Sequence, residues 1–429
     1  MLALLLALTA VPSQDTLRLA AGVHGGPLVI DRPTVVLGDS GAVVRGDGRG
    51  SVVVIAAPGT VVRGLRIERS GRDPDRNDAG VMVTADSVTL EDLVIRDILF
   101  GVYLKQVRGV VVRRLDIEGP RALRESEMAD GITLYASRGV VAEHNRIAYV
   151  RDGIYFSYSD SVVVRHNRVS HVRFGLHYMF SHRNRFERNV FTDNAAGAVL
   201  MNSNGIRVED NVFAWNAGSR SYGLVLQTAT DPTVTGNLLV GNGIGVFFDN
   251  VIRGTFSGNL VAGNWIGLQL FTNSEQTRVT GNAIVGNTFD AAGGGLEGAY
   301  QLCVNGRGNY WAAAAADGYD LDGDGVLDAP HSAGSPLAEL ALQRAGLRLF
   351  LGSPAARAMS WAERSFPVFE VAGAVDSCPL ARPPRPAMLA AMPVAPSGST
   401  GGRSGQQAAG ALLTGAGLAV LAASRRRIA

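Results

Sequence analysis

The chain has 429 residues, of which 46% are hydrophobic and 18% charged, so it is able to bury a large core and is not an intrinsically disordered protein. Its 40 basic and 38 acidic residues leave a formal net charge of +2, which argues against a nucleic-acid-binding protein. Its two cysteines, Cys303 and Cys378, exclude a four-cysteine zinc site and a framework of several disulfides; whether they pair stays open.

The N-terminus begins with an apolar run at 2–10, followed by a proline and polar residues. This order is typical of a short secretory signal peptide, although no basic residue precedes the run. We therefore predict that residues 1–13 are a signal peptide and that the protein is exported. A first buried strand is the alternative interpretation of the same run.

Residues 14–310 contain a repeat of about 22 residues. The repeat is marked by an asparagine series (Asn145, Asn167, Asn189, Asn211, Asn237, Asn259, Asn282) and a glycine series (Gly131, Gly153, Gly175, Gly197, Gly223, Gly245, Gly267). Each unit consists of short alternating segments separated by turns. Several residue series that repeat in one phase are stronger evidence for the fold than local secondary-structure propensity. We therefore predict an all-β fold, a right-handed parallel β-helix with one repeat per coil. The asparagines are then explained as ladders that stack between turns, without any functional role.

Counting from each repeat glycine predicts which side chains point outward. Side chains alternate along a strand, so the first and third positions after the glycine face the core and the second and fourth face out. The outward columns are rich in aromatic residues, which is typical of a docking surface. The predicted partner-binding residues are Tyr103, Tyr135, Tyr155, Phe247 and Phe271. A C-terminal segment that covers this face is the simpler alternative.

The same outward columns contain a candidate copper site. His177 and Met179 lie two residues apart on one predicted strand, and Met201 follows Met179 one repeat later. Stacked strands lie about 4.8 Å apart, so these side chains are able to share one ion. Imidazole and thioether donors together suit Cu(I). Five of the seven histidines fall within 144–182, which favours a metal site over isolated surface histidines.

Paired carboxylates are scarce in the outward columns. Asp249 has no carboxylate at the same position of a neighbouring repeat. Because glycoside cleavage needs two carboxyl groups, this argues against a sugar-cleaving enzyme.

Residues 311–392 form a predicted C-terminal segment with an aspartate-rich turn, DLDGDGVLD at 320–328. Asp320, Asp322, Asp324 and Asp328 place oxygen ligands at positions 1, 3, 5 and 9 with a glycine at position 6, which suits a structural calcium turn. Position 12 is a histidine, so the turn is not a full EF-hand loop. An Asp-Gly turn held by its own hydrogen bonds is the alternative.

The chain ends in a predicted flexible linker at 393–407 and an apolar tail with an arginine triplet at 408–429. The basic triplet would face the cytoplasm, so the tail is either a membrane anchor or a sorting signal that is later removed.

Several segments of the chain resemble the NosD family of periplasmic β-helix proteins, which assist maturation of nitrous oxide reductase. They are RDGIY (151–155), RFGLHYMFS (173–181), GAVLMNS (197–203), GNYW (308–311), the aspartate-rich turn, FPVF (366–369) and PLARP (379–383). Together they span about residues 18–383. The resemblance implies an accessory protein, not an enzyme, that helps deliver copper and assemble the copper centres of the reductase. It also implies an ABC transporter ATPase and permease and a copper lipoprotein as partners, and His177, Met179 and Met201 as the residues for copper or partner contact.

Two other functions stay open on sequence grounds. Many parallel β-helices are polysaccharide lyases, hydrolases or epimerases, and an aromatic outward face would suit stacking against sugars. A structural or adhesive solenoid at the cell surface would need neither metal nor catalysis. The fold alone does not choose among the three.

Overall fold

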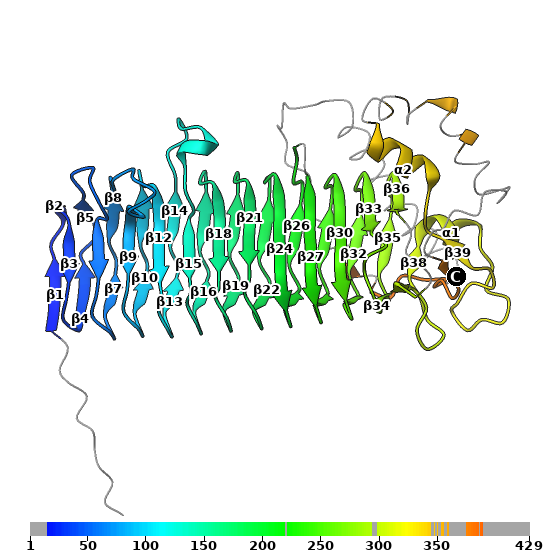
Figure 1. Cartoon of the computed structure of the whole chain (residues 1–429), viewed down its shortest axis with the longest axis horizontal. Helices are drawn as coiled ribbons and strands as arrows, with labels where there is room; N and C mark the ends of the chain where they lie inside the picture. The colour runs from blue at the N-terminus through cyan, green and yellow to red at the C-terminus, as the bar shows by residue number, and fades with distance from the viewer. Residues whose placement is uncertain are drawn as a thin grey trace, which may run out of the picture.

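The computed structural model describes residues 15–218, 221–293, 298–344 and 375–385, with a few isolated positions between 347 and 388. Its strands form three long parallel sheets of 13, 13 and 12 strands, in which each strand pairs with the strand three places further along the chain. The chain therefore winds through sheets A, B and C once per coil and builds a long rod (Figure 1). The predicted parallel β-helix is confirmed.

Most strands are only three to five residues long. Sheet A contains β1 (Asp15–Leu19), β4 (Thr34–Gly38), β7 (Val61–Arg63), β10 (Thr89–Glu91), β13 (Val111–Arg113), β16 (Val141–Glu143), β19 (Val163–Arg165), β22 (Arg185–Glu187), β25 (Arg207–Glu209), β28 (Thr233–Thr235), β31 (Thr255–Ser257), β34 (Thr277–Thr280) and β37 (Tyr300–Gln301). Sheet B contains β2 (Gly22–Gly25), β5 (Ala42–Arg45), β8 (Arg66–Glu68), β11 (Val94–Arg96), β14 (Asp116–Glu118), β17 (Arg146–Ala148), β20 (Arg168–Ser170), β23 (Val190–Thr192), β26 (Val212–Ala214), β29 (Leu238–Val240), β32 (Leu260–Ala262), β35 (Ala283–Val285) and β38 (Tyr310–Trp311). Sheet C contains β3 (Leu28–Ile30), β6 (Val53–Ile55), β9 (Ala79–Val83), β12 (Phe100–Lys105), β15 (Ile132–Tyr135), β18 (Asp152–Ser157), β21 (Phe174–Met179), β24 (Ala196–Asn204), β27 (Tyr222–Thr230), β30 (Ile244–Ile252), β33 (Ile266–Leu270) and β36 (Phe289–Ala292).

The repeat glycine and the alternation after it set the shape of each coil. In β18 and β21 the first and third positions after the glycine are buried, as predicted, and they carry Ile154, Phe156, Leu176 and Tyr178. A Cβ atom added at Gly175 would lie 2.5 Å from a carbonyl oxygen of the next coil, which is closer than any side chain tolerates. Glycine is therefore required where sheet C begins in successive coils.

The predicted asparagine ladder runs through the interior of the rod. Each member donates from its backbone N and its Nδ2 to the Oδ1 of the next, for example Asn189 to Asn211 at 2.9 Å for both bonds. The ladder passes through Asn309 and ends on Asp376, whose Oδ2 accepts the Asn309 backbone N–H at 2.7 Å. A carboxylate only accepts hydrogen bonds, so it is a natural end for a ladder of donors that all point one way.

Asp376 belongs to a small unit that closes the C-terminal end of the rod. This unit contains α1 (Ala312–Asp317) and the antiparallel pair β39 (His331–Ser332) and β40 (Val375–Asp376). Cys303 and Cys378 form a disulfide, which answers the question left open by the sequence. No helix in the described part of the chain is both long enough and apolar enough to span a membrane. The predicted signal peptide, linker and tail lie outside the described residues.

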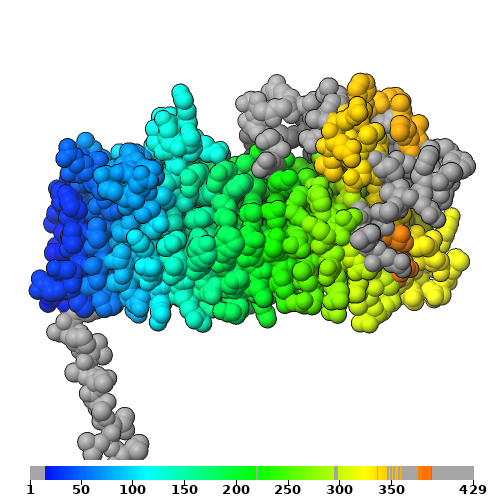
Figure 2. All heavy atoms as spheres, in the orientation of Figure 1, coloured from blue at the N-terminus to red at the C-terminus, as the bar shows by residue number. Residues whose placement is uncertain are grey.

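Two elements stand out from the coils beside the outward face of sheet C. The loop at 119–130, with the 3-10 helix η1 (Glu125–Glu127), projects from the rod before β15, and α2 (Pro336–Gln343) lies over the last coils (Figures 1 and 2). Leu337 and Ala338 of α2 pack on Ile244, Ile266 and Phe289 of sheet C. The alternative of a covering C-terminal segment is thus correct for the last coils.

Candidate functional site

His177 lies near the centre of the outward face of sheet C, on β21. Its side chain is 14% exposed, and its Nδ1 lies 2.8 Å from Oδ2 of Asp152. The rings of Tyr155 and Phe174 stand edge-on to the imidazole, each with its centroid 5.1 Å away. A hydrogen bond and two flanking rings therefore hold the imidazole in one orientation.

Asp152, one position before the repeat glycine of β18, orients this imidazole through its Nδ1. Nε and Nη2 of Arg173 donate to its two oxygens at 2.8 and 2.7 Å. Burial alone would raise the pKa of Asp152, but the hydrogen bonds from His177 and Arg173 outweigh it and hold the pKa below its usual value. An ionised Asp152 only accepts, so Nδ1 of His177 donates this hydrogen bond and Nε2 is the ring nitrogen left for another partner.

Asp130 occupies the same position one coil earlier, so two carboxylates are paired beside this face, in a buried column that the sequence expectation of scarce carboxylates did not include. It accepts hydrogen bonds from Arg151 at 3.0 Å and from Thr133 at 3.2 Å. Burial raises its pKa, and the neighbouring charge of Asp152 adds to the effect, while Arg151 opposes it. The side chains of Asp130 and Asp152 are only 2% and 0% exposed, so both orient their neighbours and neither faces the solvent.

Met179 and Met201 lie beside His177 in the same face. They are paired residues of β21 and β24, and both are half-buried. Paired residues of neighbouring strands lie about 4.8 Å apart, and a shared ion between these thioethers and His177 stays a prediction. One imidazole nitrogen and two thioether sulfurs form a soft donor set that fits Cu(I) better than the harder divalent ions.

Comparisons with known proteins agree with the resemblance that several sequence segments show to the NosD family. The family model described as "Periplasmic copper-binding protein (NosD)" matches residues 114–316. The chain is 38% identical over 387 residues to the "Probable ABC transporter binding protein NosD" of Pseudomonas aeruginosa, an alignment that covers 85% of this chain and 88% of that protein. A protein of the same description from Stutzerimonas stutzeri is 36% identical over 389 residues, covering 87% and 88%. This chain belongs to the NosD family.

Solved structures of other proteins share parts of the fold. The A-module of the mannuronan C-5 epimerase AlgE6 of Azotobacter vinelandii is 15% identical, with a TM-score of 0.45, over 67% of this chain and 83% of that one. An alginate lyase of a Paenibacillus species is 15% identical, with a TM-score of 0.37, over 70% and 92%. This degree of likeness says nothing about the activity of a NosD-family protein.

The predicted partner-binding residues differ in how much surface they offer. Tyr103 is only 9% exposed and packs against Phe100, so it contributes little. Tyr155 and Phe247 are half-buried, whereas Tyr135 and Phe271 are each 39% exposed. The open part of the face is therefore edged by Tyr135 at one end and Phe271 at the other.

The aspartate-rich turn brings three of its four predicted ligands together. Carboxylate oxygens of Asp320, Asp322 and Asp324 all lie within 4.8 Å of one another. Oδ1 of Asp320 is buried and has no hydrogen-bond partner within the described residues. Asp328 is outside this group and accepts a hydrogen bond from the backbone N–H of Leu321 at 2.9 Å. Calcium at this turn stays a prediction.

Sequence reasoning missed the residues that orient His177. Only the second and fourth positions after each glycine were considered outward, whereas the position before the glycine also lines this face. That column carries alanine, phenylalanine, tyrosine or isoleucine in other coils but aspartate in two successive ones, Asp130 and Asp152. Two buried aspartates in an otherwise apolar column were the available signal, because a buried charge needs partners.

Proposed function

We propose that this chain is a periplasmic accessory protein of the NosD type that binds Cu(I) transiently and passes it on for copper-centre assembly in nitrous oxide reductase. Copper is the cargo, held by His177, Met179 and Met201, and the protein is not itself an enzyme. The observation that carries the proposal is the hydrogen bond of 2.8 Å from His177 to Asp152, in the same face as two paired methionines.

This arrangement suits reversible transfer of a soft ion. Asp152 orients the imidazole and keeps Nε2 available, as carboxylates behind metal-binding histidines commonly do. Thioethers are neutral, so no proton is released when Cu(I) binds them and none is taken up when it leaves. The names of the relatives support an accessory and binding role, and the family description supports copper and the periplasm.

The open face between the 119–130 loop and α2 is the proposed docking surface for partner proteins. The proposed partners are an ABC transporter, contacted through its permease while its ATPase stays on the cytoplasmic side, a copper lipoprotein and the reductase; the permease and the lipoprotein would be reached at or near the membrane. Export by residues 1–13 and anchoring by residues 408–429 belong to the same proposal.

Lys105 allows a direct test of the docking surface. It is the only lysine of the chain, is exposed on β12, and pairs with Tyr135 of β15. A crosslinker that links amines should therefore join partners to the chain through Lys105 or the N-terminal amine, and Lys105→Arg should abolish the product that passes through the lysine. A crosslink yield unchanged when Tyr135→Ala and Phe271→Ala are combined would contradict docking on this face.

The test of the copper site is an anaerobic competition titration of the full chain with Cu(I) and a chromophoric chelator. We expect one ion per chain, and loss of binding when His177→Gln, Met179→Leu and Met201→Leu are combined. The matched control combines His171→Gln with Met359→Leu, two exposed positions away from the site. Equal affinity of the site variant and the control would overturn the proposal.

One observation favours a second function, a polysaccharide-modifying enzyme. Asp130 and Asp152 lie one coil apart beside His177 and Tyr155, which supplies acid and base groups of the right types. Their burial opposes it, because a catalytic carboxyl must reach the substrate. Incubating the chain with uronate polysaccharides and following chain length and product unsaturation separates the two functions; any turnover abolished by Asp152→Asn would establish the enzyme.

A further inference from the structure

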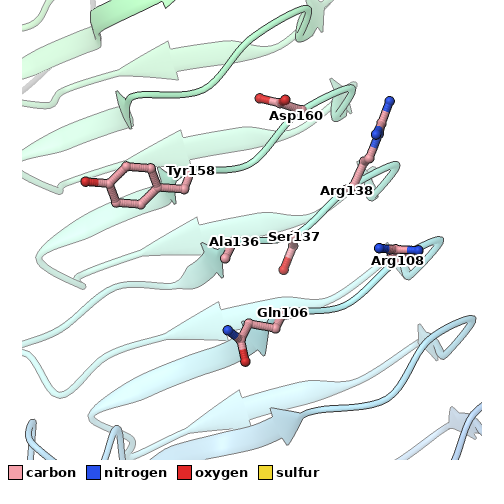
Figure 3. A pocket seen from close by; sticks show the side chains of 7 residues that line it. All are labelled: Gln106, Arg108, Ala136, Ser137, Arg138, Tyr158 and Asp160. Atoms are coloured by element: carbon pink, nitrogen blue, oxygen red, sulfur yellow. The ribbon is translucent and has the colours of Figure 1, made fainter.

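A shallow polar trough lies on the turns that follow sheet C, outside the proposed copper site. Its volume is about 350 Å³, and Figure 3 shows its lining side chains on three successive coils. They are Gln106, Arg108, Ala136, Ser137, Arg138, Tyr158 and Asp160. None of the candidate copper ligands contributes to it.

The trough exists because one turn position changes size from coil to coil. Gln106, Ala136, Tyr158 and Phe180 are the first residues after sheet C in successive coils, all in the left-handed conformation, with φ between 48° and 56°. At the second of these coils the side chain is only a methyl group. Ala136 and Ser137 therefore form a floor between the amide of Gln106 and the ring of Tyr158 (Figure 3).

The aromatic side of the trough costs stability without burying its rings. Left-handed φ values disfavour bulky residues, and asparagine occupies the same column in later coils, at Asn202 and Asn250. Tyr158 and Phe180 are nevertheless 58% and 41% exposed, and their rings stack at 5.5 Å with an interplanar angle of 11°. Strain that the fold does not recover as burial is typical of a site that binds something.

The opposite side of the trough carries two cations that have no partner in the part of the chain that the structure describes. Arg108 and Arg138 are exposed, are bridged through their backbones, and form no ion pair or side-chain hydrogen bond within the described residues. Arginines at comparable turns are paired, such as Arg253 with Asp231 at 2.8 Å. Two exposed guanidinium groups on adjacent coils, unpaired among the described residues, favour a ligand with repeated carboxylates, because each guanidinium recognises one carboxylate bidentately.

We infer that this trough binds an acidic oligosaccharide, a chain of carboxylate-bearing sugar rings. A sugar ring has an apolar face for Tyr158, hydroxyls for Gln106, and carboxylates for Arg108 and Arg138. The sugar units repeat along the oligosaccharide, as the coils repeat along the rod. An acidic peptide fits less well, because the floor offers no apolar pocket in which a side chain could anchor.

Binding of an oligogalacturonate to the full chain, measured by calorimetry at low and moderate ionic strength, tests this inference. We expect binding that weakens with salt, and a dissociation constant raised by about tenfold or more when Arg108→Ala and Arg138→Ala are combined. Ala136→Phe should block the trough without removing any charge, since the next coils already accept rings at this position. Arg168→Ala, an exposed arginine of sheet B, is the matched control.

Other outcomes would overturn the inference. Absence of binding by the unmodified chain, or equal binding of a neutral oligosaccharide of the same length, would contradict recognition of carboxylates. Binding of a poly-glutamate peptide in preference to the oligogalacturonate would make the trough a protein-docking site instead. Normal binding by the variants would show that the ligand binds elsewhere on the chain. Thermal melts of each variant distinguish a loss of binding from a loss of fold.

Discussion

The interior of the turns and the outward face of sheet C are built on the same coils but differ in how their residues repeat. The asparagine ladder places one residue type in every coil from Asn145 to Asn309, and each amide bonds to the next. In the column that contains Asp130 and Asp152, the residue type changes from apolar to charged for two coils and then back. Stacking explains the asparagine column, which we call the constant column because it keeps one residue type. The column of Asp130 and Asp152, which we call the changing column, departs from its own apolar pattern at a cost in stability. That departure requires another reason, which we assign to function.

The largest expected effect comes from breaking the constant column. Asn189→Leu removes the acceptor of two hydrogen bonds from Asn167 and the donor of bonds to Val164 and Asn211. Buried groups left unpaired should lower the free energy of unfolding by about 3 kcal/mol or more. Urea titration measures it, with Arg188→Ala in the same coil as a near-neutral control. A loss under about 1 kcal/mol would contradict a structural role for the ladder.

A smaller effect, on binding and not on stability, is expected in the changing column. Asp152→Asn keeps the shape of the side chain but removes the charge that holds His177 and Arg173. We expect Cu(I) affinity to fall by about 10- to 100-fold, as for other groups that orient a metal ligand. Chelator competition measures the change. If Asp152→Asn lowers the melting temperature as much as Asn189→Leu does, the column is structural as well.

A third test concerns Glu91 on sheet A, which should make the stability of the fold sensitive to acid. Burial would raise its pKa, but hydrogen bonds from Arg113 and Arg63 hold the pKa at about 2. Because this pKa is lowered, the stabilisation is complete above the unfolded pKa of about 4.3 and is lost as pH falls from there towards 2. Glu91→Gln should lower stability at neutral pH by about 1–3 kcal/mol and flatten this acid limb. Unfolding curves between pH 2 and 7 check it, with the exposed Glu125→Gln as the control.

The smallest expected effect is at the aspartate-rich turn, which is far from either column. If calcium binds there, adding millimolar Ca²⁺ should raise the melting temperature by a few degrees, because ligands stabilise the state that they bind. Asp322→Asn should remove the increase, and Mg²⁺ should not replace calcium. An identical melting curve in Ca²⁺ and in a chelator would leave the turn as one held only by its own hydrogen bonds.

The fold was predictable from the sequence because its physics is periodic. One glycine position, one asparagine position and strict alternation recur in nearly every coil, so each repeat confirms the others. The candidate site was only partly predictable: the placement of His177, Met179 and Met201 on one face followed from column positions, but the contacts of Asp152 and Arg173 did not. Their roles depend on a buried ion pair between neighbouring coils, and the repeat pattern of the sequence does not reveal such a pair. The sequence offered the covering of the outward face of sheet C by a C-terminal segment as an alternative, but it did not show that α2 covers only the last coils, since the packing partners of α2 lie far away in sequence.

The measurement that tests the central claim most directly is X-ray absorption at the copper edge of the full chain loaded with one equivalent of Cu(I). The account predicts one imidazole nitrogen and two thioether sulfurs around the ion, with the sulfur signal reduced by half in either Met179→Leu or Met201→Leu. Copper bound only to nitrogen and oxygen, or a sulfur signal unchanged in both variants, would contradict a copper site at His177, Met179 and Met201 on the outward face of sheet C.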